Sequence, residues 1–191
     1  LICTTACLGS YLDQCIVRDD MEEAHAHLQE LKDIFGDRLF IEVQPFNDVE
    51  QIKANLALIE LAKEYDIKLV TGTDSHYVNK EDHYVHDILL CIGTGAKLKD
   101  TDRFSFKNEF WFMSYDEVIE HYESQIRLGG IPNEYEYECA IQESLNNTYV
   151  LASMVENNIK LKSDTPIMPN YEVPKGFTPE SYLSTQCWLG L

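Results

Sequence analysis

The sequence is poor in basic residues. It holds 15 Lys and Arg against 33 Asp and Glu, which gives a formal net charge of −18 over 191 residues. The acidic residues are spread along the chain, and a surface of this sign repels phosphate backbones. This scarcity disfavours a basic stripe that grips DNA. A strand end could still reach a metal site, because divalent ions invert the local potential.

Several other features are missing. No run of about 20 apolar residues is present, so we expect no membrane-spanning helix. The chain opens at Leu1 without a basic leader, and it ends on the apolar stretch 188–191, so we predict no secretion signal and expect both ends to be cuts in a longer polypeptide. The six cysteines show no CxxC spacing, which favours reduced thiols in a cytoplasmic protein. No P-loop, GxGxxG or GxSxG motif and no paired polymerase aspartates occur.

What is present in the first third of the chain is an alternation of strands and helices. Residues 1–5, 39–43 and 67–71 are apolar or β-branched runs that predict strands. Helices are predicted between them. One is capped by Asp19 or Asp20 and stopped by Gly36, and the other is capped by Asp48 and ends near Tyr65. This order is typical of parallel α/β units.

The remainder predicts further helices. One begins near Glu81 and stops at Gly93, and its expected inward residues are Val85, Ile88, Leu89 and Ile92. Residues 103–112 crowd five aromatic side chains and predict a short hairpin or excursion. Ser114 and Glu117 form a capping box before another helix, and a longer helix is expected over 133–156. Four prolines then predict a linker: Pro166, Pro169, Pro174 and Pro179. Residues 178–191 resemble the start of a helical unit.

The most informative loop is Asp74-Ser75-His76, which directly follows the buried-looking strand ending at Thr71. In α/β barrels the carboxyl ends of the strands carry the active site. A carboxylate and an imidazole two residues apart in an extended loop can face one ion, and zinc or manganese accepts such a mixed donor set. On its own such a motif is more often an ordinary polar loop than a metal site.

Cys7 occupies the equivalent place after the first strand, where a thiolate would suit zinc. The alternative is that Cys7 is a small buried hydrophobe. Glu42 lies mid-strand and could point into a barrel or line an edge. Among the histidines, His83 and His86 share a helix face but lie downstream of the loop.

Five stretches, in chain order, resemble the PHP (polymerase and histidinol phosphatase) domain of bacterial-type DNA polymerase III alpha subunits. Residues 4–9 (TTACLG) are similar to the strand and turn that supply a cysteine ligand, and residues 69–77 (LVTGTDSHY) to the last metal motif. Residues 81–92 resemble the helix that closes the site, and residues 103–112 the connector after it. Residues 161–183 resemble the passage into the polymerase module. The resemblance implies three parts: the C-terminal part of a distorted seven-stranded β/α barrel (1–99), a mainly helical connector (100–162), and a linker with the start of the polymerase module (163–191).

By this resemblance, Cys7, Asp74 and His76 are ligands of a multinuclear centre of divalent ions (zinc, manganese or magnesium), whose other ligands come from strands upstream of Leu1. Glu42, Tyr77 and His86 are implied to support those ligands. Some members of the family use the intact centre as a 3′→5′ proofreading exonuclease, and others keep the domain as a structural brace. Gly72-Thr73 replaces the more usual Thr-Asn, and Phe46 stands where some members carry histidine. This drift fits a phage or otherwise divergent polymerase.

We therefore expect a parent protein that is a DNA-directed DNA polymerase (a nucleotidyltransferase), acting in the cytoplasm of a bacterial or phage-infected cell. Its expected partners are DNA, other replisome subunits and the rest of the polymerase chain, with no membrane. The isolated chain is expected to lack polymerase activity and to bind metal weakly. Two alternatives remain open: a non-catalytic scaffold and, less favoured by the connector, a stand-alone PHP phosphoesterase.

Overall fold

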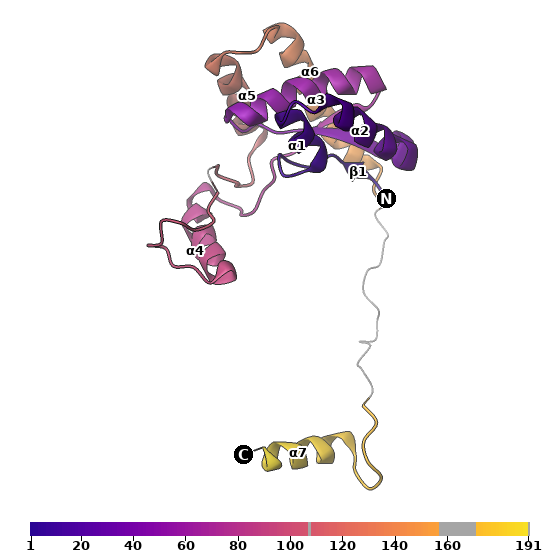
Figure 1. Cartoon of the computed structure of the whole chain (residues 1–191), viewed down its shortest axis with the longest axis vertical. Helices are drawn as coiled ribbons and strands as arrows, with labels where there is room; N and C mark the ends of the chain where they lie inside the picture. The colour runs from indigo at the N-terminus through magenta and orange to yellow at the C-terminus, as the bar shows by residue number, and fades with distance from the viewer. Residues whose placement is uncertain (107, 157–170, 191) are drawn as a thin grey trace. The chain divides into compact units, whose positions relative to one another are not determined.

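A computed structural model describes residues 1–106, 108–156 and 171–190. The chain divides into two compact units, Leu1–Val155 and Glu156–Leu191, and each is described by itself. The first unit contains the sheet and six of the α-helices (Figure 1). The second contains the helix α7 (Pro179–Leu189), which begins after the N-cap Thr178 as the sequence predicts. Pro166 and Pro169 of the predicted linker lie outside the described residues.

The sheet has three parallel strands in the order β1 (Cys3–Thr4), β2 (Leu39–Val43) and β3 (Lys68–Thr71). Cys3 pairs with Leu39, and Val43 pairs with Thr71, so all three carboxyl ends meet at one edge. The helices α2 (Met21–Phe35) and α3 (Val49–Tyr65) connect successive strands. The predicted parallel α/β arrangement is confirmed, but the described residues form an open sheet of three strands rather than a closed barrel.

Local capping signals set most helix boundaries. Asp20 Oδ1 accepts from the Glu23 amide at the start of α2, and Gly36 ends that helix with φ 53°. Asp48 caps α3 in the same way, and Ser114 forms the predicted capping box at the start of α5 (Tyr115–Leu128). Helix α1 (Tyr11–Val17), whose N-cap is Ser10, was not predicted from the sequence.

The core lies on the face of β2 that presents Leu39, Ile41 and Val43, all at most 2% exposed. The helices α1, α2 and α3 pack together beside the sheet, as Figure 1 shows. The long helix α6 (Glu134–Ser153) lies along β3, and its Asn147 side chain donates to the Leu69 carbonyl at 2.8 Å. Residues far downstream in the sequence therefore complete the packing of the last strand.

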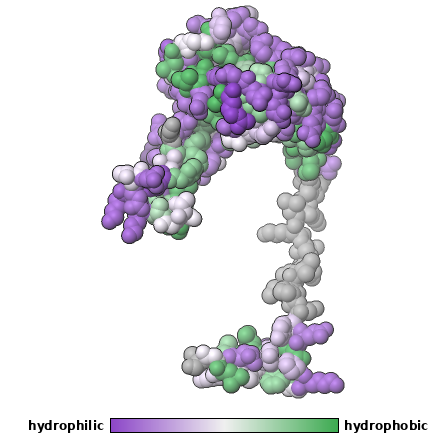
Figure 2. All heavy atoms as spheres, viewed as in Figure 1, coloured by the Kyte–Doolittle hydropathy of each residue, from purple (hydrophilic) through white to green (hydrophobic). Residues whose placement is uncertain are grey.

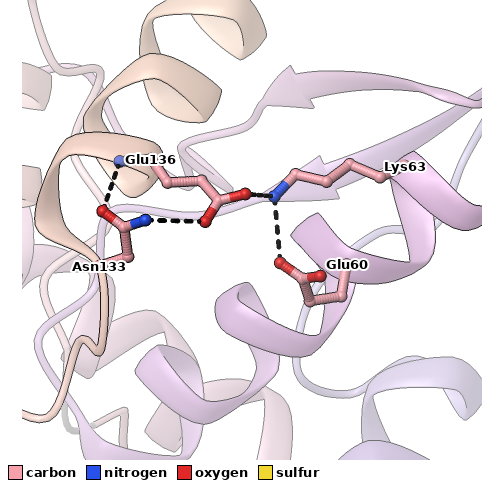
Figure 3. Close-up of polar contacts among 4 residues, drawn as sticks. All are labelled: Glu60, Lys63, Asn133 and Glu136. Carbon is pink, nitrogen blue, oxygen red and sulfur yellow. Dashed lines mark hydrogen bonds and ion pairs between the residues drawn. The ribbon is translucent and has the colours of Figure 1, made fainter.

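An exposed ion-pair cluster joins α3 to the start of α6 (Figure 3). Lys63 of α3 pairs with Glu136 of α6 and lies 3.1 Å from Glu60 Oε1 on its own helix. Asn133, the N-cap of α6, donates to Glu136 Oε2 at 3.1 Å and accepts from its amide at 3.2 Å. These bonds raise the pKa of Lys63 and lower that of Glu136. The cluster fixes the place where α6 begins.

The predicted helix after the 72–78 loop is present, with a short 3-10 turn η2 (Lys80–Asp82) before α4 (His83–Thr94). The prediction that its apolar residues point inward was wrong for three of them: Val85, Leu89 and Ile92 are 53%, 59% and 73% exposed. Only Cys91 of α4 is fully buried. No described helix is long and apolar enough to span a membrane.

The aromatic segment 103–112 does not form a hairpin within its described residues. Its end instead runs beside the 72–78 loop, where Tyr77 and Trp111 form an isolated parallel bridge. Phe110 and Trp111 are buried, and Phe110 joins Phe46 edge to face with ring centroids 4.9 Å apart. This segment therefore anchors the 72–78 loop.

Candidate functional site

The loop that follows β3 brings Asp74 and His76 together. Asp74 Oδ1 lies 3.5 Å from His76 Nε2, and the two side chains are 34% and 31% exposed. Asp74 adopts a left-handed backbone conformation (φ 45°), which aspartate tolerates better than most residues. The loop thus presents one carboxylate oxygen and one imidazole nitrogen to a common point at the carboxyl end of a parallel strand.

The aromatic connector holds this loop through its backbone. The His76 amide donates to the Phe110 carbonyl at 2.8 Å, and the Phe112 amide donates to the Val78 carbonyl at 3.3 Å. The Ser75 hydroxyl donates to the Trp111 carbonyl at 3.2 Å. These bonds hold the middle and end of the loop, whose first residue is held by the sheet through the bond from the Gly72 amide to the Val43 carbonyl. The crowded aromatic residues are visible in the sequence, but their contact with this loop could not be predicted from it.

Three rings surround the His76 imidazole: Phe110, Phe106 and His86, at centroid distances of 5.0, 5.1 and 5.3 Å. His86, on α4, stacks on Phe106 at 5.6 Å with 19° between the planes. Burial among these rings lowers the pKa of His86, with smaller contributions from His76 and His83. These three rings restrict the orientation of the His76 imidazole, whose Nε2 lies 3.5 Å from Asp74 Oδ1.

Tyr77 connects the loop to the aromatic connector and to α4. Its hydroxyl accepts from the Phe110 amide at 2.7 Å and lies 3.2 Å from His83 Nδ1. Its ring centroid lies 5.2 Å from that of His86. Partial burial raises the pKa of Tyr77, so it stays a neutral phenol that both donates and accepts. Of the residues expected to support the ligands, Tyr77 and His86 therefore do lie beside His76.

Glu42 of β2 lies next to the start of the loop. Its Oε1 accepts from Gln44 Nε2 at 2.8 Å, and a Cβ added to Gly72 would lie only 1.9 Å from that oxygen. Glycine at position 72 therefore leaves the space that the Glu42 carboxylate fills. The unusual Gly72 noted in the sequence has a packing reason.

Asp13 of α1 is a carboxyl group that the sequence analysis missed. It is 1% exposed, accepts from the Ser10 hydroxyl at 2.7 Å through Oδ2, and leaves Oδ1 buried without a hydrogen-bond partner. Burial raises its pKa to about 7, and the nearby Glu42 carboxylate adds to the rise. A sequence signal for it was hard to see, because an aspartate in the first turn of a helix is ordinary.

A buried amide network closes the carboxyl end of β2. Asn55 Nδ2 donates to the Gln44 carbonyl at 2.8 Å and lies 3.3 Å from the Tyr137 hydroxyl. Gln125 Nε2 donates to the Phe46 carbonyl at 2.5 Å, and Tyr137 donates to Gln125 Oε1. Burial raises the pKa of Tyr137 to about 12. The network joins α3, α5 and α6 to the turn after β2.

Cys7 lies in the turn between β1 and α1, half-buried, with its carbonyl accepting from the Ser10 amide at 2.7 Å. All six cysteines are free thiols. Among the described residues, no group of three or more His, Cys, Asp and Glu is placed to hold a metal ion. Asp74 and His76 are thus described as a pair, and the role of Cys7 as a third ligand stays a prediction.

The donor chemistry of the pair suits a divalent ion. Two donors each about 2.1 Å from a tetrahedral ion lie roughly 3.4 Å apart, close to the 3.5 Å observed between Asp74 Oδ1 and His76 Nε2. One carboxylate and one imidazole form half of a four-coordinate shell, so the remaining donors have to come from outside this pair.

Comparison with known proteins gives the context of this loop. No family model matches the chain. It is 32% identical over 178 residues to the DNA polymerase III subunit alpha of Borreliella burgdorferi, and 32% identical over 192 residues to that of Thermus aquaticus. It is also 30% identical over 189 residues to a DNA-directed DNA polymerase of Bacillus phage SPbeta.

These alignments cover 93%, 100% and 91% of this chain but only 14%, 15% and 13% of the relatives. The chain thus spans about one seventh of the length of the curated relatives that it matches. The similarity runs through both the Asp74 loop and the aromatic connector, because it covers nearly every residue. The chain is therefore homologous, along its whole length and at about 30% identity, to one segment of DNA polymerase III alpha subunits.

Proposed function

We propose that the chain is the C-terminal part of a PHP-type domain in a replicative DNA polymerase of the DNA polymerase III alpha kind. Within it, Asp74 and His76 serve as two ligands of a divalent metal centre. The observation that carries the site is the 3.5 Å separation of Asp74 Oδ1 and His76 Nε2 at the carboxyl end of β3. DNA synthesis belongs to the parent protein, and the role of this segment is metal-dependent 3′→5′ hydrolysis of a strand end.

The residues of this chain have distinct tasks in such a centre. The Asp74 carboxylate and the His76 imidazole hold the ion, and Cys7 supplies a third ligand once the parent chain completes the site. Phe106 and Phe110 fix the His76 ring and exclude water from its sides. When bound, a divalent ion supplies an activated water and neutralises phosphodiester charge.

The acidic surface limits how DNA reaches the loop. With a net charge of −18, this segment repels the duplex, so other parts of the parent have to bind the primer-template. Only a frayed strand end then approaches Asp74 and His76. This arrangement favours removal of terminal nucleotides over cleavage inside a duplex.

The test is metal content and exonuclease activity of the full-length parent, compared with an Asp74→Ala/His76→Ala variant. A matched control is Glu30→Ala/His27→Ala, which removes another acid–histidine pair, 4.0 Å apart on α2. We expect stoichiometric metal in the parent and the control, and loss of both metal and nuclease activity in the first variant. Equal metal content in all three proteins would refute the metal site.

A second candidate is a non-catalytic brace for the polymerase. The backbone bonds from the buried aromatic connector favour it, because they hold the Asp74 loop in place without a metal ion. Under this alternative, Asp74→Ala/His76→Ala leaves metal content and exonuclease activity unchanged and lowers only the thermal stability of the parent. The same measurements therefore separate the two candidates.

A further inference from the structure

Helix α4 carries an apolar stripe that faces water. Val85, Leu89 and Ile92 follow one another at i, i+4 and i+7, and Tyr84 beside them is 63% exposed. Figure 2 shows green, hydrophobic residues at the surface of the segment that carries this helix. Single exposed apolar side chains are common on soluble proteins, but four on three turns of one helix form a patch of the kind that binds a partner.

The opposite face of α4 packs against other parts of this chain. His86 packs on His76 and Phe106, and Asp87 forms a two-pronged ion pair with Arg103, with N–O distances of 2.6 and 2.7 Å. Cys91 is buried on the same side. The helix is therefore fixed in orientation by contacts within the chain, and the apolar stripe is held outward.

The stripe is also uncharged. Asp87 is the only Asp, Glu, Lys or Arg in the twelve residues of α4, and Arg103 neutralises it. The rest of the chain is strongly acidic. A basic partner or a nucleic acid would find no charge to recognise here, so the surface is suited to an apolar, uncharged counterpart.

We propose that the α4 stripe (Tyr84, Val85, Leu89 and Ile92) is the docking surface for an apolar segment of the remaining parent polypeptide. This inference rests on the proposed function, which places the chain in a protein of the relatives' length. The chain spans 14% of the Borreliella burgdorferi relative, so most of such a parent lies outside it. Because His86 on the other face touches His76, the docked segment and the metal loop share one helix.

The stripe makes a prediction about amide exchange that needs neither metal nor nuclease activity. Hydrogen–deuterium exchange of residues 83–94 is measured in the isolated chain and in the full-length parent. We expect the α4 amides to exchange at least 10-fold more slowly in the parent, because docking suppresses opening of the helix. Equal exchange rates in the two proteins would overturn the proposal.

Two variants identify the surface. Leu89→Asp places a charge in the stripe, and Ile34→Asp changes an equally exposed apolar residue of α2, since both side chains are 59% exposed. In the parent, Leu89→Asp is expected to remove the extra protection of α4, whereas Ile34→Asp keeps it. Unchanged protection in Leu89→Asp would contradict the proposal. In the isolated chain both variants should melt within about 2 °C of the wild type, which shows that Leu89 is not needed for folding.

Sedimentation of the isolated chain distinguishes the occupant. We expect a monomer at micromolar concentration; a dimer that Leu89→Asp dissociates would assign the stripe to a second copy and refute docking of the parent chain. The outcome is separable from that of the metal experiment. If Asp74→Ala/His76→Ala retains metal while α4 remains protected in the parent, the metal site fails and the docking surface stands.

Discussion

Replacing Asp13 by Asn should remove a large part of the pH dependence of folding. The Asp13 side chain is 1% exposed, and its Oδ1 has no hydrogen-bond partner. Burial, with a smaller contribution from the Glu42 carboxylate, raises its pKa from 3.8 to about 7, against the opposing effect of the Ser10 hydrogen bond. The folded chain therefore holds a proton that the unfolded chain releases near pH 4.

The direction and size of the pH effect on stability follow from the difference in the Asp13 pKa between the folded and unfolded states. A raised carboxyl pKa stabilises the folded state fully below pH 3.8, and this contribution declines as the pH rises and is lost above about 7. Three pKa units at 1.36 kcal/mol each give about 4 kcal/mol over the whole window, and about 3 kcal/mol between pH 5 and pH 8. This contribution is a substantial part of the free energy of unfolding of a typical domain, which is roughly 5–15 kcal/mol.

The assay is urea unfolding at pH 5 and pH 8 for the wild type, Asp13→Asn and a control, Asp37→Asn, which changes an exposed aspartate. The wild type and the control should lose about 3 kcal/mol more than Asp13→Asn between the two pH values. Because every other titrating group is shared, the difference isolates Asp13. Parallel pH profiles for all three proteins would refute the assignment of a raised pKa to this carboxyl.

Three further substitutions test the packing beside the loop, the amide network after β2 and the ion-pair cluster between α3 and α6. Gly72→Ala should lower the free energy of unfolding by about 1–3 kcal/mol, because its Cβ would lie 1.9 Å from Glu42 Oε1. Adding Glu42→Ala should restore most of this loss, as measured by urea unfolding. A double variant as unstable as Gly72→Ala would contradict the clash. Asn55→Ala should lower the free energy of unfolding by about 3 kcal/mol, because it leaves buried polar groups unpaired. The control Asn146→Ala changes an exposed residue and should stay within about 0.5 kcal/mol of the wild type. Similar melting temperatures for the two variants would count against the network. Lys63→Ala should lower the free energy of unfolding by less than about 1 kcal/mol, and this loss should be smaller in about 1 M salt, which screens the ion pairs. A loss that does not depend on salt would show that packing, not charge, is responsible.

Local signals were sufficient to predict much of the fold. The strand 39–43 and the caps at Asp20, Asp48 and Ser114 were correct because each depends on neighbouring residues. Helix α1 was missed for the opposite reason. It has only seven residues, and the buried Asp13 interrupts its apolar pattern.

The surroundings of the candidate site could not be predicted in this way. The Asp74 and His76 motif was visible in the sequence, but the rings around His76 come from α4 and from the connector some 30 residues later. The assignment of Cys7 as a third ligand stays a prediction, as do the domain boundaries near residues 99 and 162. Helix α4 shows the converse limit. Its apolar pattern predicted burial, yet Val85, Leu89 and Ile92 are exposed among the described residues.

The amide network after β2 has a consequence for the order of events during synthesis. Asn55 meets Tyr137, which is 82 residues further along the chain. At roughly 5–20 residues per second, a ribosome needs about 4–16 s to make that stretch. Throughout this interval the Asn55 amide can bond only to water or to nearby groups such as Gln44. The early α/β units therefore remain incompletely closed until α5 and α6, which are translated later, have been made.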